Sequence, residues 1–209
     1  MTRMLDALEK GRQRLRRERA KKLPASALVG SMLRYAAQTL TAPVYLRGVT
    51  RVGAGVRTLG RPRIDNLGQM TIGDDTLLRS INVPVELATG AAGTLEIGRE
   101  VRLDYGVSIG AMGSVRIGDR VRIGPYAMIL DTEFHDLYDR STMPTPRPVV
   151  IEHDAQIGAK ASIMPGVTLG AFSIVSTSAV VTSDVAPYTV VAGVPAREVR
   201  KVNPGPPLP

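Results

Sequence analysis

The strongest constraint on this sequence is an aliphatic residue that returns every six positions. The clearest run is Ile151, Ile157, Ile163, Leu169, Val175 and Val181, and a small or medium residue follows four positions after each of them. The same spacing recurs upstream at Ile97, Leu103 and Ile109 and, after a two-residue shift, at Ile117, Ile123 and Ile129. A six-residue period fits neither a helix of about 3.6 residues per turn nor a strand with alternating faces. It predicts a solenoid, in which each hexad forms one short flat side and one corner.

In such a solenoid the first and fifth residues of each hexad point inward, and backbone hydrogen bonds join one coil to the next. Glycine follows the aliphatic residue in several hexads, as at Gly118 and Gly158, where we expect a tight backbone near a corner. We therefore predict an all-β solenoid over residues 49–190. A helical arm is expected at 1–48, a short helix at 191–203, and a disordered tail at 204–209.

The positive charge of the chain is concentrated near its start. The net charge is +8, and residues 1–22 contain nine Lys or Arg and three Asp or Glu, so the rest of the chain is close to neutral. This asymmetry argues against a nucleic-acid-binding protein. Leucines at helical spacing predict a basic amphipathic helix in 1–22, and a second helix is expected from about Ala25 to Leu40. The basic helix is either a solvated arm or a contact for anionic lipid head groups or a polyanionic substrate.

Composition excludes several kinds of site. The chain has no Cys, which excludes disulfides and thiolate metal sites, and its two His are too few for a zinc site built on histidines. We expect no metal. No apolar run approaches the length of a membrane span, and the start of the chain lacks the apolar core of a signal peptide. We expect a cytoplasmic protein, with peripheral contact at the inner face of the membrane through residues 1–22 as an open alternative.

The repeat resembles that of the hexapeptide-repeat acyltransferases, whose members form a left-handed parallel β-helix. Its most specific segments are IGPYAMILDTEFHD at 123–136, PVVIEHDAQIGAKASIMPGVTLG at 148–170 and VVTSDVAPYTVVAGVPAREVRKV at 180–202. Within this family the sequence is most similar to the maltose, galactoside and polysaccharide O-acetyltransferases. The resemblance implies a homotrimer, acetyl-CoA bound between neighbouring subunits, and transfer of an acetyl group to a sugar hydroxyl.

One long loop interrupts the repeat at residues 131–148, which is long enough to be a functional loop. It contains His135, which matches the position of the family's catalytic histidine. Acyl transfer to a hydroxyl needs a base with a pKa near neutrality, and histidine fits this need without large tuning. Asp131 and Asp136 flank it and could orient the ring or stabilise the imidazolium. His153, by contrast, falls at a hexad corner, where we expect a surface role.

The resemblance also implies residues for the donor and the acceptor. Ala159 and Thr177 match small residues whose backbone groups hold the pantetheine arm, and their separation of eighteen residues predicts that they stack on one face. Thr182 and Ser183 match the turn that follows. Several positions depart from the family pattern, including Gln156 where a Trp is common and Ser183 where a Lys is common.

Arg197 and Arg200 match basic residues that meet the nucleotide phosphates, on the helix expected after GVPA. The alternative is that they only mark the basic end of that helix. Asp104 aligns with a position that faces the acceptor and is usually Asn, and the adjacent Tyr105 is a second expected acceptor contact. Asp104 either alters the acceptor contacts or is an ordinary corner carboxylate.

Three function classes follow. The first is an acetyl-CoA-dependent O-acetyltransferase on a sugar or glycan precursor, with His135 as general base. The second keeps the fold and acetylates the amine of an amino sugar nucleotide. The third is a non-catalytic β-helix scaffold whose basic arm docks to a membrane or polyanion, and such a scaffold has no need of His135.

Overall fold

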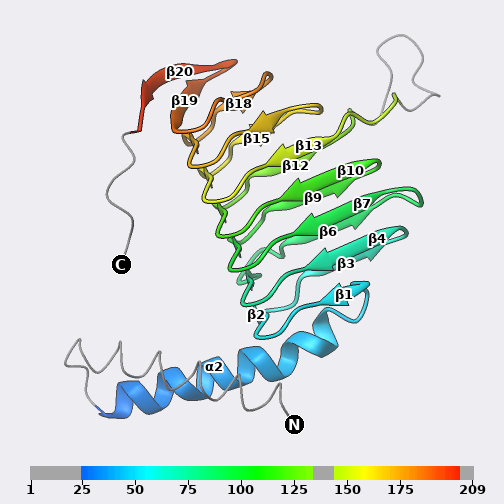
Figure 1. Ribbon diagram of the computed structural model, residues 1–209. Helices are drawn as coiled ribbons and strands as arrows, with labels where there is room; N and C mark the ends of the chain where they lie inside the picture. The colour runs from blue at the N-terminus through cyan, green and yellow to red at the C-terminus, as the bar shows by residue number, and fades with distance from the viewer. Residues whose placement is uncertain (1–24, 134–143, 203–209) are drawn as a thin grey trace.

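The protein forms a three-sided prism of parallel strands (Figure 1). The computed structural model describes residues 25–133 and 144–202 of the chain. From β1 to β18, successive strands belong to successive sides, so that strands pair with those one coil earlier and one coil later, and β19 then pairs with β17. All of these pairings are parallel except the last, between β19 and β20. The predicted parallel β-helix is confirmed.

The three sheets are named A, B and C in the order in which the chain enters them. Sheet A contains β1 (Arg51–Val52), β4 (Gln69–Ile72), β7 (Thr94–Ile97), β10 (Ser114–Ile117), β13 (Val149–Ile151) and β16 (Thr168–Leu169). Sheet B contains β2 (Arg57–Leu59), β5 (Leu77–Arg79), β8 (Arg102–Leu103), β11 (Arg122–Ile123), β14 (Gln156–Ile157), β17 (Ile174–Val175), β19 (Thr189–Gly193) and β20 (Ala196–Lys201). Sheet C contains β3 (Arg63–Asn66), β6 (Glu86–Thr89), β9 (Ser108–Ala111), β12 (Met128–Leu130), β15 (Ser162–Ile163) and β18 (Val180–Val181).

The core consists of the two inward positions of the hexads. The first-position residues of the clearest run, such as Ile151, Ile163 and Leu169, are at most 1% exposed. The fifth-position residues Ala155 and Ala161 are fully buried. The period therefore predicted the core correctly, because one large and one small side chain fill the space that each hexad brings to the axis of the prism.

Glycines at the corners are required by close backbone contact between coils. A Cβ on Gly118 would lie 2.6 Å from the backbone nitrogen of His153, and one on Gly158 would lie 2.5 Å from that of Thr177. Neither glycine has a positive φ, so the space between coils, and not the backbone conformation, excludes a side chain here.

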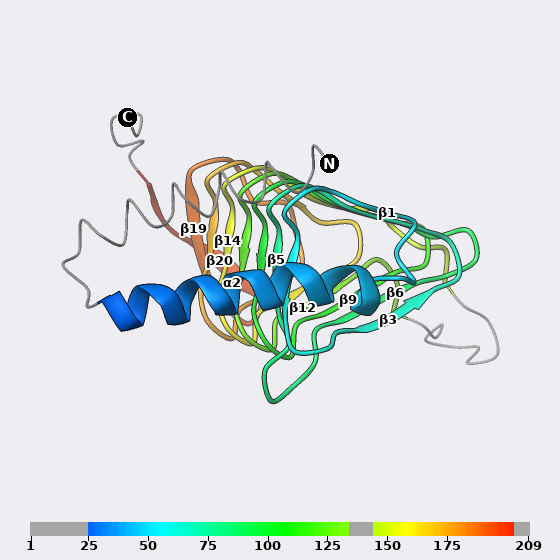
Figure 2. The same ribbon diagram turned by 90° about the horizontal axis from the view of Figure 1, so that it is seen from below.

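A helix, α2 (Ala25–Tyr45), lies across the end of the prism that is formed by the first coil (Figure 2). Ala42 of the helix and Leu46, directly after it, are buried, and the ring of Tyr35 lies 4.9 Å from the guanidinium of Arg57. The helix continues past the predicted end at Leu40 because Ala42 and the following residues pack against the first coil. No helix in the described part of the chain is long and apolar enough to cross a membrane.

The helix predicted at 191–203 is wrong. Residues 196–201 form β20, which runs antiparallel to β19 and adds a strand to the end of sheet B. The last parallel strand leaves a row of backbone groups without a coil to pair with, and β20 satisfies them. Only Ala196 of β20 is buried, so this segment has no apolar face that a helix could pack against the prism.

Candidate functional site

The long loop leaves the prism at the corner between sheets C and A. Residues 134–143 lie outside the described residues, so the structure describes only the two ends of the loop. The predicted site residues His135 and Asp136 are among those that it does not describe. The N–H of Arg147 donates to the carbonyl of Asp131 at 2.7 Å, which closes the loop at its base. The N–H of Gly166 in turn donates to the carbonyl of Arg147 at 3.0 Å, which ties the base to the next coil.

Asp131 is buried at the start of the loop. Its Oδ1 accepts the N–H of Met112 at 2.8 Å, and its Oδ2 accepts those of Gly113 and Ser114, both at 2.7 Å. The carboxylate therefore caps the turn that joins β9 to β10. The structure does not test whether Asp131 also orients His135.

The same corner carries two further polar residues that the sequence analysis missed. Asn66 ends β3 and Thr89 ends β6, at the same corner where Asp131 follows β12. The hydroxyl of Thr89 accepts the N–H of Gly68 at 3.0 Å and donates to Oδ1 of Asn66 at 2.6 Å. The local sequence gives no consistent signal for these residues, because β9 ends in Ala111 and β15 is followed by Met164. Thr89 thus holds the turn between β3 and β4, and Asp131 holds the turn between β9 and β10 at the base of the long loop.

Ala159 and Thr177 lie in successive turns at the corner between sheets B and C. The N–H of Ser178 donates to the carbonyl of Ala159 at 2.8 Å, which joins the two turns. Thr177 is exposed and Ala159 is half-buried. The predicted stacking is confirmed, and their contact with coenzyme A stays a prediction.

Asp104 and Tyr105 lie at the same corner, in an earlier coil. The guanidinium of Arg79 pairs with Oδ1 of Asp104 at 2.7 Å, and the Asp104 side chain is only 19% exposed. The ring of Tyr105 meets that of Tyr126 edge-on, with 5.5 Å between centroids. This ion pair fits the corner-carboxylate interpretation of Asp104, and its predicted contact with an acceptor is untested.

Thr182 and Ser183 are exposed in the turn after β18. This turn is at the corner between sheets C and A, where the long loop also emerges. The next residue, Asp184, accepts the N–H of Thr168 through Oδ1 at 2.7 Å and so attaches the turn to β16. The two-residue strand β18 thus separates Thr182 from the corner that carries Thr177.

Arg197 and Arg200 lie on β20 and not on a helix. Arg197 pairs in register with Ala192 and Arg200 with Val190, and a bulge interrupts the register between these pairs. Val190 and Ala192 are two residues apart on β19 and therefore point to the same face, and cross-strand partners share a face. The extra residue Val199 forms the bulge, so Arg197 and Arg200, although three residues apart, both lie on the outward face of sheet B. Both are exposed.

His153 lies at the corner between sheets A and B, facing solvent as predicted. Its Nδ1 lies 2.8 Å from Oδ2 of Asp154, and its side chain is 51% exposed. Asp154 also pairs with the guanidinium of Arg120 at 2.6 Å, and this hydrogen bond lowers the pKa of Asp154 below its usual range. In the coil before, the hydrogen bond from Arg99 likewise lowers the pKa of Asp119.

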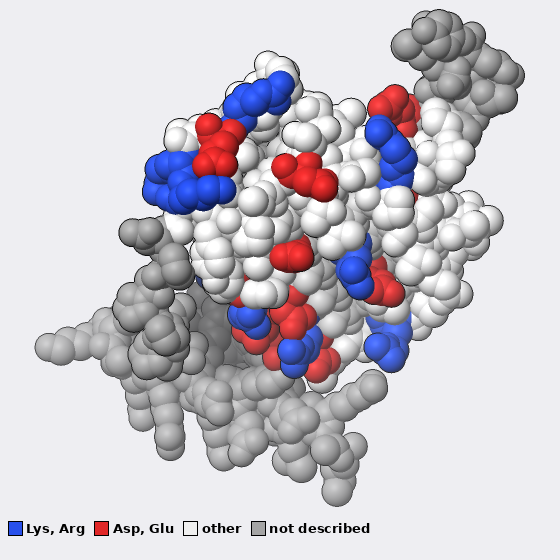
Figure 3. Space-filling view, turned by 45° about the horizontal axis from the view of Figure 1, so that its top comes forward, with Lys and Arg blue, Asp and Glu red and all other residues white. Residues whose placement is uncertain are grey.

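Figure 3 shows basic and acidic side chains interspersed over the face in view, without a broad area of one sign. Within residues 25–133 and 144–202, no group of three His, Asp or Glu side chains is placed to hold a metal ion.

Comparison with known proteins agrees with this architecture. Residues 148–183 match the family model for the hexapeptide repeat of succinyl-transferase. The chain is 32% identical over 126 residues to the galactoside O-acetyltransferase of Escherichia coli (strain K12), covering 59% of this chain and 61% of that protein. It is 50% identical over 60 residues to the 2,3,4,5-tetrahydropyridine-2,6-dicarboxylate N-acetyltransferase of Ligilactobacillus salivarius, covering 29% of this chain and 26% of that protein. The chain spans only about a quarter of the length of relatives of this second kind.

A solved structure extends the likeness to most of the chain. The N-acyltransferase AntD from Bacillus cereus, in complex with dTDP-4-amino-4,6-dideoxyglucose and coenzyme A, superposes with a TM-score of 0.64 at 16% identity. The match covers 78% of this chain and 90% of AntD, and it supports the fold alone. The chain folds as a parallel β-helix with a hexapeptide repeat, and its predicted resemblance to the hexapeptide-repeat acyltransferases is confirmed.

Proposed function

We propose that this chain is an acetyl-CoA-dependent O-acetyltransferase that moves an acetyl group to a hydroxyl of a sugar or glycan precursor. The observation that carries the proposal is the long loop, which interrupts the solenoid at the corner between sheets C and A and contains His135 in its sequence. Both described ends of this loop are fixed to the coils by hydrogen bonds. A likeness to the galactoside O-acetyltransferase over 59% of the chain supports the same activity.

In the proposed mechanism the imidazole of His135 removes the proton of the acceptor hydroxyl while its oxygen attacks the thioester carbonyl. Backbone N–H groups stabilise the negative oxygen of the tetrahedral intermediate. The intermediate collapses to the acetyl ester, and the departing thiolate of coenzyme A takes the proton back from His135. Asp131 already accepts three backbone hydrogen bonds, so we assign it to positioning the loop and assign Asp136 to orienting the ring.

For the donor, we propose that acetyl-CoA lies along the corner between sheets B and C. In this proposal the stacked turns of Ala159 and Thr177 lie against the pantetheine arm, and Thr182 and Ser183 lie at the far end of β18. Arg197 lies on the far side of β19 from the Thr177 turn. It pairs with Ala192 of β19, and the N–H of Ser176 donates to the carbonyl of the neighbouring Val191 at 2.9 Å. A guanidinium there suits the nucleotide phosphates.

We further propose that the chain assembles as a homotrimer and is located in the cytoplasm. We propose Asp104 and Tyr105 as acceptor contacts in the earlier coil of the donor corner. Residues 1–22, proposed to contact the membrane, lie outside the described residues.

A second candidate is acetylation of an amine on an amino sugar nucleotide. It is favoured by the 50% identity to an N-acetyltransferase over 60 residues and by the fold shared with an N-acyltransferase. A non-catalytic β-helix scaffold is the third candidate function.

The test is release of the thiol of coenzyme A from acetyl-CoA, measured with neutral sugars and with amino sugar nucleotides as acceptors. His135→Ala should lower kcat by at least about a hundredfold and leave the KM for acetyl-CoA within about twofold, because a general base contributes at this level. His153→Ala is the matched control, since it removes the other histidine from an exposed corner, and it should keep the parent rate. Equal rates in the two variants would rule out His135 as the base, and thiol release with amines alone would favour the second candidate.

A further inference from the structure

The solvent-facing side of α2 carries an apolar stripe where a surface helix normally carries charge. No charged residue occurs from Tyr35 to Leu46, and the exposed positions of this stretch are Ala36, Ala37, Leu40, Pro43 and Val44. Leu40 is 76% exposed and Val44 is 61% exposed, one helical turn apart. Helices on a protein surface usually turn polar side chains to water, so these five residues, here called the apolar stripe, need an explanation.

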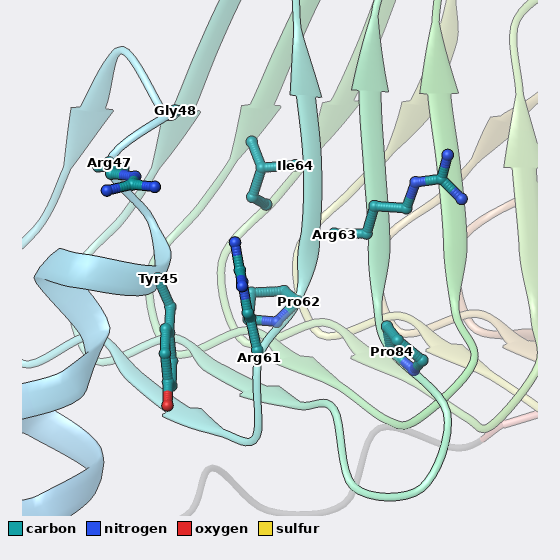
Figure 4. A pocket seen from close by; sticks show the side chains of 8 residues that line it. All are labelled: Tyr45, Arg47, Gly48, Arg61, Pro62, Arg63, Ile64 and Pro84. Carbon is teal, nitrogen blue, oxygen red and sulfur yellow. The ribbon is translucent and has the colours of Figure 1, made fainter.

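An arginine-lined hollow lies next to the end of this helix. Its volume is about 460 Å³, and its lining includes Tyr45, Arg47, Arg61 and Arg63. Figure 4 shows Arg47 and Arg61 on neighbouring sides of the hollow and Arg63 directed away from it. Arg63 has its own partner, since its guanidinium lies 3.6 Å from Glu86.

Arg47 and Arg61, here called the arginine pair, have no ion pair with a carboxylate among the described residues. Two guanidinium groups that border one hollow repel each other unless an anion lies between them. Planar guanidinium groups are well matched to phosphate oxygens. The hollow therefore fits a phosphate group.

We propose that this end of the prism docks on the surface of an anionic phospholipid bilayer. Arg47 follows Val44 by three residues, so the arginine pair and the apolar stripe lie at the same end of α2. In the docked state the stripe enters the boundary between head groups and acyl chains, and the arginine pair binds lipid phosphates. The 24 residues before α2, with six net positive charges in 1–22, would be attracted to the same surface. The proposal does not depend on the acetyltransferase activity.

The test is co-sedimentation of the full-length chain with vesicles of phosphatidylcholine, with and without about a third of phosphatidylglycerol. Arg47→Gln/Arg61→Gln should weaken binding to the anionic vesicles by about tenfold or more, because each basic residue near an anionic lipid surface contributes to the binding free energy. The matched control is Arg102→Gln/Arg122→Gln, which removes the same charge from two exposed positions on the outward face of sheet B. It should stay within about threefold of the parent.

A third variant, Leu40→Ser/Val44→Ser, should weaken binding by about tenfold as well, because it removes apolar side chains that would be buried in the bilayer. All four substituted arginines and both apolar residues are exposed or border open space, so the thermal unfolding of each variant should match the parent.

Three results would overturn the proposal. The first is equal weakening by the two arginine variants, which would reduce the effect to net charge. The second is equal binding to neutral and anionic vesicles. The third is that the parent chain does not bind vesicles and that the Leu40→Ser/Val44→Ser variant forms a smaller particle than the parent by light scattering. This result would show that a second copy of the chain covers the stripe.

Discussion

Replacing Asp131 by Ala tests the structural half of the account at the base of the long loop. The carboxylate is 0% exposed and accepts three backbone hydrogen bonds of 2.7–2.8 Å. A hydrogen bond to a charged acceptor contributes about 1.5–3 kcal/mol when both groups are fully buried. The three donors, on Met112, Gly113 and Ser114, are only half-buried, so water can reach them once the carboxylate is gone. We therefore expect a loss of about 1 kcal/mol for each bond, or about 3 kcal/mol in the free energy of unfolding.

The assay is urea unfolding followed by far-ultraviolet circular dichroism, at one protein concentration because subunit association changes apparent stability. Asp131→Asn should lose less, about 1–2 kcal/mol, since one oxygen can still accept N–H groups. Glu133→Ala is the control, because this exposed side chain meets Arg147 only at 3.5 Å, and its loss should stay below about 0.5 kcal/mol. An Asp131→Ala variant within 1 kcal/mol of the parent would refute the capping role.

Three further predictions concern the prism itself. Ile163→Ala should cost about 2–5 kcal/mol in unfolding free energy by leaving a cavity in the core, whereas the outward-facing Ser162→Ala should change it by less than about 0.5 kcal/mol, both measured by urea unfolding. Gly158→Ala should lower the melting temperature measured by calorimetry, because its Cβ would lie 2.5 Å from a backbone nitrogen of the next coil; an unchanged melting temperature would contradict the close packing. Arg120→Gln should cost up to about 1 kcal/mol at pH 7. The ion pair lowers the pKa of Asp154 from its usual 3.8, so the loss of stability in Arg120→Gln should be constant above pH 3.8 and vanish as the pH falls through the lowered pKa. A loss that persists at pH 2 would contradict the ion pair.

The sequence predicted the core better than it predicted the ends. Hexad positions such as Ile151 and Ala155 repeat at one spacing, and a solenoid gives each of them the same inward environment, so the pattern could be recognised without knowing which coil pairs with which. The stacking of Ala159 and Thr177 followed from the same regularity, since eighteen residues return the chain to the same corner.

The C-terminal segment could not be predicted in this way, because its conformation depends on a partner strand and not on its own pattern. The residues of β20 adopt a strand because the edge of β19 offers them backbone hydrogen bonds, and only the register with the bulge at Val199 shows that Arg197 and Arg200 share a face. The cap made by Asp131 was missed for a similar reason. It depends on a turn seventeen to nineteen residues earlier in the chain, and nothing in the local sequence of the loop signals that contact.

The most direct test of the central claim is calorimetric titration of acetyl-CoA into the full-length protein, with the Arg197→Ala/Arg200→Ala variant alongside. The account predicts one site per chain with a dissociation constant on the order of micromolar, weakened in the variant because it loses the two guanidinium groups proposed to bind the nucleotide phosphates. Absence of binding up to millimolar acetyl-CoA would leave the β-helix standing and contradict the proposed acetyltransferase.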